Sequence, residues 1–338
     1  MSDLQLPAMG VGSYAAPGWF IAMQRLMKPE DLGEIDAREL IEDATRVVVE
    51  DQIEAGLNII SDGELGRQRF VFEVLGRLSN LTRVPPPRRL GIAGYDKAPS
   101  FVSVGPIVAE GGLGTVAEFE RTRMIAPDHW IKIALPGPLT FGSYIAAGER
   151  SKEVVLEELV TIVRHELVAL AQAGCSYLQL DEPGLAHMPY GMTFEDGARV
   201  INRAIEGVPG RIAVHVCYGN NAGRPMADRR LRPMMRALMS LSCDQLLLEF
   251  AAKQMSDVEL LGELAGKFEI AAGVIDVKNF YLETPEDVAQ RIDACLQHAP
   301  IERLGVTCDC GFSALPRYLA RQKMRAMVAG AKLVRGRA

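Results

Sequence analysis

The stretch RIAVHVC at residues 211–217 carries apolar side chains at consecutive positions instead of at alternate ones. The runs IKIAL at 131–135 and QLLLEF at 245–250 share this character. A strand that is buried on both faces needs apolar side chains on both of them, which is typical of parallel sheets covered by helices. These runs therefore predict a buried parallel sheet.

Runs of this kind recur along the chain, with helical sequence between them. Residues 151–174 have apolar positions at helical spacing and end in a glycine, and residues 284–287 form a helix start with an N-cap Thr, a Pro and two acids. We expect eight strands, at 9–14, 58–64, 130–136, 177–182, 211–217, 245–250, 269–276 and 303–310. Strands that alternate with helices in this way predict an α/β fold, a (β/α)8 TIM barrel. An open doubly wound sheet is the alternative, disfavoured because no G-x-G-x-x-G or P-loop follows the first run.

One segment interrupts the alternation. Residues 80–128, between the second and third expected strands, contain PPPRR, several glycines and the β-prone pieces SFVSVGPIV and GTVAEFERTRMI. We predict a hairpin-like insertion here that serves as a lid or a contact surface, on a single catalytic barrel domain that spans residues 1–338.

Composition narrows the class of protein. The chain has 338 residues, 48% of them hydrophobic, and a formal net charge of −6. This mild acidity argues against a nucleic-acid partner, which needs clustered Lys and Arg. The absence of an apolar run of about 18 residues and of a signal peptide argues against a membrane association and predicts a cytoplasmic protein. Six cysteines are too few for a disulfide framework and are better candidates for metal or catalytic roles.

The active site of such a barrel lies at the carboxyl ends of its strands. His215 and Cys217 are two residues apart in a strand and therefore point to the same side. Glu249 ends the next strand and Cys310 ends the eighth. One imidazole, two thiols and a carboxylate suit tetrahedral Zn²⁺. The alternative is that these residues are unconnected, and Cys308 is a rival for the last ligand position.

Two carboxylates end other strands. Asp181 ends the fourth, and Glu64 ends the second in DGELGR. Carboxylates that converge on a pocket hold an ammonium group or relay protons. The alternative is that they form salt bridges to Arg67 or Arg69 at the rim.

With these residues the chain resembles a known family, the catalytic half of cobalamin-independent methionine synthase. This family belongs to the superfamily shared with uroporphyrinogen decarboxylase. The matching motifs run along nearly the whole chain: VGSY at 11–14, DGE at 62–64, LPGPLTF at 135–141, QLDEPGLA at 179–186, HVCY at 215–218, LLLE at 246–249, GVID at 273–276 and DCG at 309–311. The chain lacks the family's long N-terminal half and is similar to the short, single-barrel members.

The resemblance implies roles for individual residues. It implies that His215, Cys217, Glu249 and Cys310 are the zinc ligands, which removes Cys308 from the set. It implies that a carboxylate pair, Glu64 and Asp181, holds the amino group of homocysteine and that Ser13 contacts its carboxylate.

Three departures from the family concern its other functional positions. Tyr144 stands where the family has the Trp that stacks on folate, Lys278 stands where it has a proton-relay His, and Asp62 replaces a His. The first two departures argue against methylfolate as methyl donor. Lys278 is a candidate to stabilise negative charge on a leaving group, or alternatively forms a salt bridge to Asp276.

The prediction is a zinc-dependent thiol methyltransferase that forms methionine from homocysteine. Its methyl donor would be a methylated corrinoid or another carrier, and a corrinoid or accessory protein is a candidate partner. The first alternative is an alkyltransferase for another thiol, such as an epoxide-opening enzyme acting on coenzyme M. A porphyrinogen-type decarboxylase and a non-enzymatic barrel that binds a methyl-carrier partner through residues 80–128 are further alternatives.

Overall fold

The computed structural model describes residues 4–26, 33–67, 74–86, 99–220 and 223–337. Residues 87–98 of the predicted insertion and Arg69 lie outside the described residues. Among the described residues, no helix combines the length and the apolar character that crossing a membrane requires.

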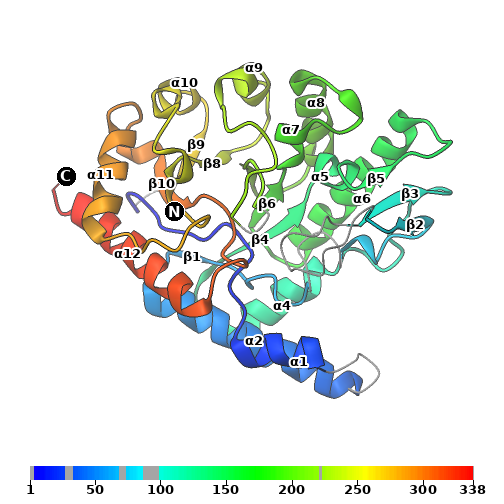
Figure 1. Cartoon of the computed structure of the whole chain (residues 1–338), viewed down its shortest axis with the longest axis horizontal. Coiled ribbons are helices and arrows are strands. Elements are labelled where there is room, and N and C mark those ends of the chain that lie inside the picture. Colours follow the sequence, from blue (N-terminus) through cyan, green and yellow to red (C-terminus); the bar gives the residue numbers. More distant parts are fainter. Residues whose placement is uncertain (1–3, 27–32, 68–73, 87–98, 221–222, 338) are drawn as a thin grey trace.

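A curled parallel sheet forms the centre of the molecule (Figure 1). Its seven strands lie side by side in the order β1 (Ile59–Ile60), β4 (Trp130–Pro136), β6 (Tyr177–Asp181), β7 (Arg211–Val216), β8 (Gln245–Glu249), β9 (Glu269–Ile275) and β10 (Leu304–Cys308). Every neighbouring pair is parallel, as the consecutive apolar runs predicted. The sheet and the helices outside it form a TIM-barrel-like α/β fold.

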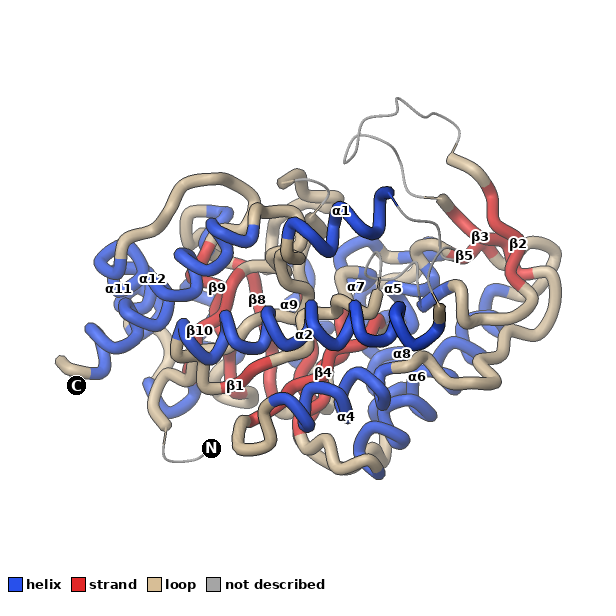
Figure 2. The backbone as a smooth tube through the Cα atoms, turned by 90° about the horizontal axis from the view of Figure 1, so that it is seen from below, coloured by secondary structure: helices blue, strands red, loops and turns tan. Residues whose placement is uncertain are grey.

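Helices lie before, between and after the strands along the chain. They are α1 (Gly18–Leu26), α2 (Glu34–Ala55), α4 (Thr115–Ile125), α5 (Pro138–Gly142), α6 (Lys152–Gln172), α7 (Gly184–His187), α8 (Phe194–Ile205), α9 (Met235–Met239), α10 (Leu261–Leu264), α11 (Pro285–Leu296) and α12 (Arg317–Arg335). Short 3-10 turns lie at Pro189–Gly191, Arg232–Met234, Ala251–Lys253, Val258–Leu260 and Ile301–Arg303. Figure 2 shows α2 and α4 side by side outside β1 and β4.

The helix predicted over 151–174 and the helix start predicted at 284–287 are both confirmed. Ser151 caps α6, because its side chain accepts a hydrogen bond from the backbone of Val154. Thr284 caps α11 in a reciprocal capping box with Asp287. Each cap satisfies backbone N–H groups that have no partner inside the helix.

The first predicted strand, at residues 9–14, is wrong, because this segment does not form a strand with a continuous hydrogen-bond ladder. It forms isolated bridges instead, from Ala8 to Val306 of β10 and from Met9 to Ile59 of β1, so the segment still lies between the two edge strands. Side chains donate hydrogen bonds to two backbone carbonyls of this segment. Lys132 Nζ donates to the carbonyl of Gly10 at 2.8 Å, and Gln179 Nε2 donates to the carbonyl of Val11 at 2.8 Å. A carbonyl bonded in this way no longer extends a strand ladder.

The second predicted strand, 58–64, is much shorter than expected. Only Ile59–Ile60 pairs as a strand. The next residue, Ser61, has both backbone groups bonded to the side chain of Gln52 in α2, at 3.0 Å and 2.8 Å. The backbone after Ile60 therefore leaves the sheet and is free to turn through the DGE motif.

The predicted hairpin between the second and third sheet strands is present, but the insertion is smaller than expected. β2 (Leu81–Val84) and β3 (Ser100–Ser103) are antiparallel, and β3 also pairs with β5 (Ile145–Ala146). The β-prone piece 114–125 is wrong as a strand, because it contains helix α4 of the outer layer. Its buried residues Thr115, Phe119 and Thr122 recur at helical spacing, and this periodicity outweighs the local β propensity.

Candidate functional site

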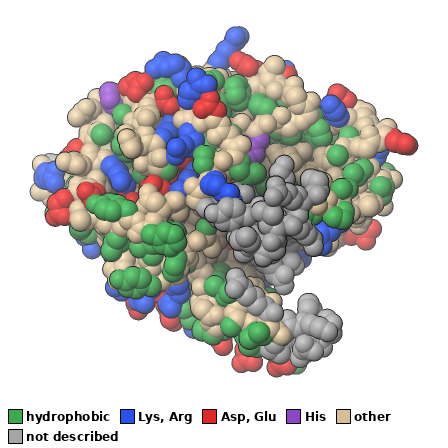
Figure 3. Space-filling model, viewed as in Figure 1, with side chains coloured by type: hydrophobic (Ala, Val, Ile, Leu, Met, Phe, Trp, Pro, Cys, Tyr) green, Lys and Arg blue, Asp and Glu red, His purple; other side chains and the backbone are tan. Residues whose placement is uncertain are grey.

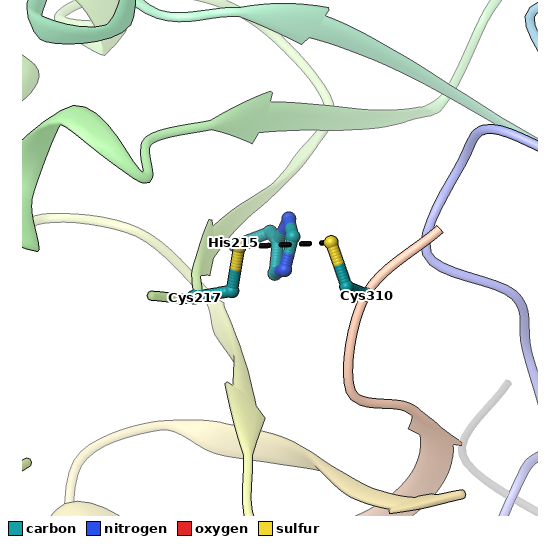
Figure 4. Close-up of side chains that lie close together, drawn as sticks. All are labelled: His215, Cys217 and Cys310. Atoms are coloured by element: carbon teal, nitrogen blue, oxygen red, sulfur yellow. Dashed lines mark hydrogen bonds between the residues drawn. The ribbon is translucent and has the colours of Figure 1, made fainter. Parts of the chain in front are cut away.

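Three side chains predicted as metal ligands lie together at the carboxyl ends of β7 and β10. Nitrogen and sulfur atoms of His215, Cys217 and Cys310 all lie within 4.8 Å of one another. Cys217 Sγ and Cys310 Sγ are 3.8 Å apart and point toward each other beside the imidazole (Figure 4). His215 and Cys217 share one side of the chain because they are two residues apart in an extended segment.

Asp181 orients the imidazole of His215. The two residues are register partners in β6 and β7, and Asp181 Oδ1 lies 3.0 Å from His215 Nδ1. Burial alone would lower the pKa of His215, but the hydrogen bond and charge of Asp181 raise it overall. Among the described residues, the buried His215 Nε2 has no hydrogen-bond partner. A carboxylate on one ring nitrogen and an unused second nitrogen is the usual arrangement of a metal-binding imidazole.

The thiols of Cys217 and Cys310 affect each other's pKa in opposite directions. The hydrogen bond from Cys217 lowers the pKa of Cys310 to about 7, assisted by His215 and Lys278 and opposed by burial. The same hydrogen bond and burial raise the pKa of Cys217. One thiolate is therefore accessible near neutral pH, and a thiolate is the form of cysteine that binds metals.

Glu249, the fourth predicted ligand, is held by Lys278 and lies outside this three-residue cluster. Lys278 Nζ is 2.5 Å from Glu249 Oε2, and the two side chains are 4% and 0% exposed. The predicted alternative, a salt bridge between Lys278 and Asp276, is wrong, because the ammonium group of Lys278 pairs with Glu249. Only the backbone N–H of Lys278 donates to Asp276, at 2.7 Å to Oδ1.

Glu64 lies buried beside Asp181. Burial raises the pKa of Glu64, the Arg67 guanidinium opposes this rise, and the charge of Asp181 adds to it. Arg67 Nη1 lies 3.9 Å from Glu64 Oε1, and among the described residues neither oxygen of Glu64 has a hydrogen-bond partner. A pair of buried carboxyl groups, one of them with both oxygens unpartnered among the described residues, favours a cationic ligand.

Backbone glycines bring Ser13 and Glu64 close to the other site residues. A Cβ on Gly311 would lie 2.0 Å from Ser13 Oγ, so the serine lies against the segment that carries Cys310. A Cβ on Gly12 would lie 2.3 Å from Glu64 Oε1. Larger residues at these two glycines would occupy the space of the side chains that we predict to bind substrate.

Tyr144 lies at the rim, next to the insertion. It follows α5, and its carbonyl accepts a hydrogen bond of 2.8 Å from Phe101 of β3. Burial raises the pKa of Tyr144, and the charge of Cys217 adds to the rise, which indicates that the phenol lies within electrostatic reach of the thiols. The small β2–β3–β5 sheet therefore attaches to the loop that carries Tyr144.

Two further buried carboxylates hold the loops around the site, and sequence reasoning gave them no such role. Glu182 accepts hydrogen bonds from the backbones of Leu139 and Thr140 at 3.1 Å and 2.9 Å. Asp309 accepts from the backbones of Phe250, Ala251 and Ala252. The signal that could have suggested them is an acidic residue next to a site residue, in DE at 181–182 and in DC at 309–310.

Asp62 supplies a prediction about stability. Burial raises its pKa to about 7, with a further rise from the charge of Glu118 and an opposing effect of Arg67. An unfolded Asp titrates near about 3.9, so between that value and the raised one the folded state holds a proton that the unfolded state has lost. The contribution of Asp62 to the free energy of unfolding therefore falls as pH rises through this interval.

The Asp62→Asn variant is expected to remove this dependence. The free energy of unfolding is measured with urea at about pH 5 and at about pH 8. Between these pH values it should fall by at least about 1 kcal/mol more in the wild type than in the variant. Equal losses in the two proteins would contradict the protonation of Asp62.

Charges are mixed on the face seen in Figure 3. Figure 3 shows Lys and Arg as well as Asp and Glu side chains on the described part of this face, together with apolar side chains.

Comparison with known proteins identifies the family. The profile of the family described as "Cobalamin-independent synthase, Catalytic domain" matches residues 6–333. A methionine synthase of Saccharolobus islandicus (strain Y.G.57.14 / Yellowstone #1) is 31% identical, with 99% of this chain and 97% of that protein covered. A methionine synthase of Pyrococcus abyssi (strain GE5 / Orsay) is 30% identical, with 98% and 93% covered.

A solved structure agrees with these sequence matches. The B12-independent methionine synthase from Shewanella sp. W3-18-1, in complex with selenomethionine, superposes with a TM-score of 0.83 at 28% identity, and 99% of each chain is covered. The fold, the motifs and these matches agree over nearly the whole length. The chain belongs to the catalytic-domain family of cobalamin-independent methionine synthases.

Proposed function

We propose that this protein is a zinc-dependent thiol methyltransferase that forms methionine from homocysteine, with a methylated corrinoid or another carrier as donor in place of methylfolate. The observation that carries the proposal is the cluster of His215, Cys217 and Cys310, whose donor atoms lie within 4.8 Å of one another. Family membership supports the methyltransferase class, and the selenomethionine bound to the Shewanella enzyme supports an amino-acid product.

The residues present fit zinc. One imidazole and two thiols form a borderline-soft donor set, which suits Zn²⁺ in tetrahedral coordination. The buried and unpartnered Nε2 of His215, among the described residues, also fits a metal ligand. His215, Cys217 and Cys310 would hold the ion, and Glu249 would be the exchangeable fourth ligand. When bound, zinc supplies a lowered pKa for the substrate thiol, so that a nucleophilic sulfur exists at neutral pH.

The protein's own side chains orient the substrate. Glu64 and Asp181 would bind the ammonium group of homocysteine, and Ser13 would bind its carboxylate. Asp181 also holds His215 at 3.0 Å, so the amino-group pocket and the metal-binding imidazole share one carboxylate. The substrate sulfur then attacks the methyl carbon of the donor, and the electron pair of the breaking bond leaves with the donor group.

The donor side of the pocket would be formed by Tyr144. A single phenol ring stacks on a smaller area than the indole found at this position in the family, which supports a donor other than methylfolate. We also propose a corrinoid or accessory protein as partner. A reducing compartment, the cytoplasm, would keep the six free cysteines as thiols.

Metal content and turnover test the proposal together. Protein purified without chelator should contain about one zinc per chain. It should form methionine from homocysteine with methylcobalamin or a sulfonium donor, and more slowly with methylfolate. Methionine formed fastest from methylfolate would contradict the interpretation of Tyr144. Zinc without methionine from any donor would favour another thiol substrate, and protein with intact thiols but no zinc would overturn the proposal.

A further inference from the structure

We propose that Lys278 is a positioning residue that competes with the metal for the carboxylate of Glu249 and so keeps the fourth coordination position accessible to the substrate thiol. The inference rests on the proposed function, because it requires a metal at His215, Cys217 and Cys310. It assigns to Lys278 a partner in the protein, instead of a direct role on the methyl donor.

The contact itself is strong. Lys278 Nζ and Glu249 Oε2 are 2.5 Å apart, and water reaches almost none of either side chain, with 4% and 0% exposed. Two buried opposite charges depend on each other, because neither can be solvated after separation. The other oxygen, Glu249 Oε1, has no hydrogen-bond partner among the described residues. Glu249 thus has one oxygen held by Lys278 and one oxygen available.

The loop that carries Lys278 is fixed in place. The backbone N–H of Asp276 donates to Glu283 Oε1 at 3.0 Å, and Glu283 Oε2 pairs with Lys323 Nζ at 2.8 Å. Lys323 also donates to the carbonyl of Asp276 at 2.7 Å. This fully buried pair clamps both ends of the 276–283 loop, so the ammonium group of Lys278 is presented from a preorganised backbone.

The backbone of Glu249 is fixed as well. Glu249 pairs in register with Gly273 of β9, and Asp309 accepts a hydrogen bond from the next residue, Phe250, at 2.9 Å. The backbone of Glu249 is therefore held in β8, and a change of partner would be a movement of its side chain. The charges of Glu249 and Lys278 both act on Cys310, so the pair lies within electrostatic reach of the cluster.

The pairing of Lys278 with Glu249 would make the exchange of Glu249 for a substrate thiol easier. A four-coordinate zinc would accept a thiol most readily as another ligand leaves, and a hard carboxylate oxygen would be the ligand that sulfur replaces. A buried carboxylate that left without a partner would remain as an uncompensated charge, which is strongly unfavourable. Lys278 provides that partner, so it lowers the free energy of the state in which Glu249 is off the metal.

Zinc affinity provides the test, with Lys278→Met, Glu249→Gln and the double variant. The zinc dissociation constant of the full chain is measured by competition with a chromogenic chelator. Lys278→Met is expected to bind zinc at least about 10-fold more tightly than wild type, a change of about 1.4 kcal/mol, because Glu249 then has no competing partner. In the Glu249→Gln background the same substitution should change the affinity by less than about threefold.

The double variant separates this proposal from simple charge repulsion. If Lys278 only repelled the cation, its removal would tighten zinc binding equally in both backgrounds, and the proposal would be overturned. Unchanged affinity in Lys278→Met would also overturn it. Lys253→Met is the matched control, because Lys253 is another buried lysine paired with a carboxylate, Asp257, at 3.0 Å; it should leave zinc affinity within about threefold of wild type. Lys278→Gln is the second variant if the methionine substitution impairs folding.

Homocysteine binding gives a second readout. In cobalt-substituted protein, the charge-transfer band of a new thiolate ligand reports homocysteine entering the coordination sphere. This band should require at least about 10-fold more homocysteine in Lys278→Met than in wild type, since Glu249 then holds its position on the metal. Wild-type protein that binds no metal would overturn the proposed function itself, an outcome distinct from metal-loaded variants that behave alike.

Discussion

Replacing Cys310 with alanine is expected to lower zinc affinity by more than about 100-fold and to abolish measurable methionine formation. Cys310 Sγ lies 3.8 Å from Cys217 Sγ, and its thiol, with a pKa lowered to about 7, is the one that ionises first. The variant keeps only an imidazole and one thiol of the three clustered donors. The measurements are zinc content after dialysis, the zinc dissociation constant, and methionine formation under saturating donor.

Cys308 offers a matched control two residues away in sequence. It is buried at the end of β10, and burial raises its pKa to about 12, so it remains a neutral thiol. It lies outside the three-residue cluster. Cys308→Ala should therefore lose some stability through a small cavity and retain its zinc. A Cys310→Ala protein that is folded and holds zinc with wild-type affinity would contradict the assignment of Cys310 as a ligand.

The second large effect is expected at Glu64. Glu64→Gln keeps the size of the side chain but removes its charge, and it should raise the KM for homocysteine by at least about 30-fold, since loss of one partner of a buried charge pair costs about 2–5 kcal/mol. Zinc content should not change, because Glu64 is not in the metal cluster. Steady-state kinetics with homocysteine as the varied substrate provide the measurement.

A thiol without the amino group makes this experiment specific. 4-Sulfanylbutanoate has the same chain and carboxylate as homocysteine but no ammonium group, so Glu64→Gln should change its kinetics by less than about threefold. Equal losses for the two thiols would show that Glu64 acts on the fold of the site instead of on the amino group.

The pH dependence of KM should also differ between wild type and Glu64→Gln. Burial raises the pKa of Glu64, so at low pH the carboxyl is protonated and binds the ammonium group poorly. As pH rises through this raised pKa, the carboxylate forms and KM should fall. Glutamine has no such titration, so the variant should lack this fall, and parallel pH profiles would contradict the assignment.

Much of the fold could be predicted because the signal is local. The consecutive apolar residues of β4, β7 and β8 predicted buried parallel strands at nearly the observed positions. The start of α11 followed from capping residues that act within one turn, and α6 followed from the helical spacing of its apolar residues. The β-prone prediction for 114–125 is wrong, because the buried Thr115, Phe119 and Thr122 recur at helical spacing and the segment forms α4.

The predicted strand at 9–14 shows that a local sequence pattern does not contain the hydrogen-bond partners of a segment. Residues 9–14 are apolar enough for a strand, yet their carbonyls are bonded by Lys132 and Gln179, which are more than a hundred residues away in sequence. Lys132 in IKIAL at 131–135 and Gln179 in YLQLD at 177–181 are visible in the sequence as polar exceptions to the apolar pattern. Their partners are not, because they depend on how the curled sheet brings its interior side chains together.

The candidate site divides in the same way. The sequence by itself determined that His215 and Cys217 share one side of a strand end, because residues two apart in an extended chain always do. It also placed Asp181 and Glu249 at the ends of strands, where a parallel barrel brings side chains together. Glu64 and Cys310 were predicted at strand ends as well, but they lie in the turns that follow β1 and β10.

Only the tertiary structure decided which of these side chains contact one another. It separated Cys310 from Cys308, joined Asp181 to His215, and paired Glu249 with Lys278 from the loop that follows β9. The physical reason is that periodicity and capping act over a few residues, whereas these pairs depend on strand register and on the path of long loops.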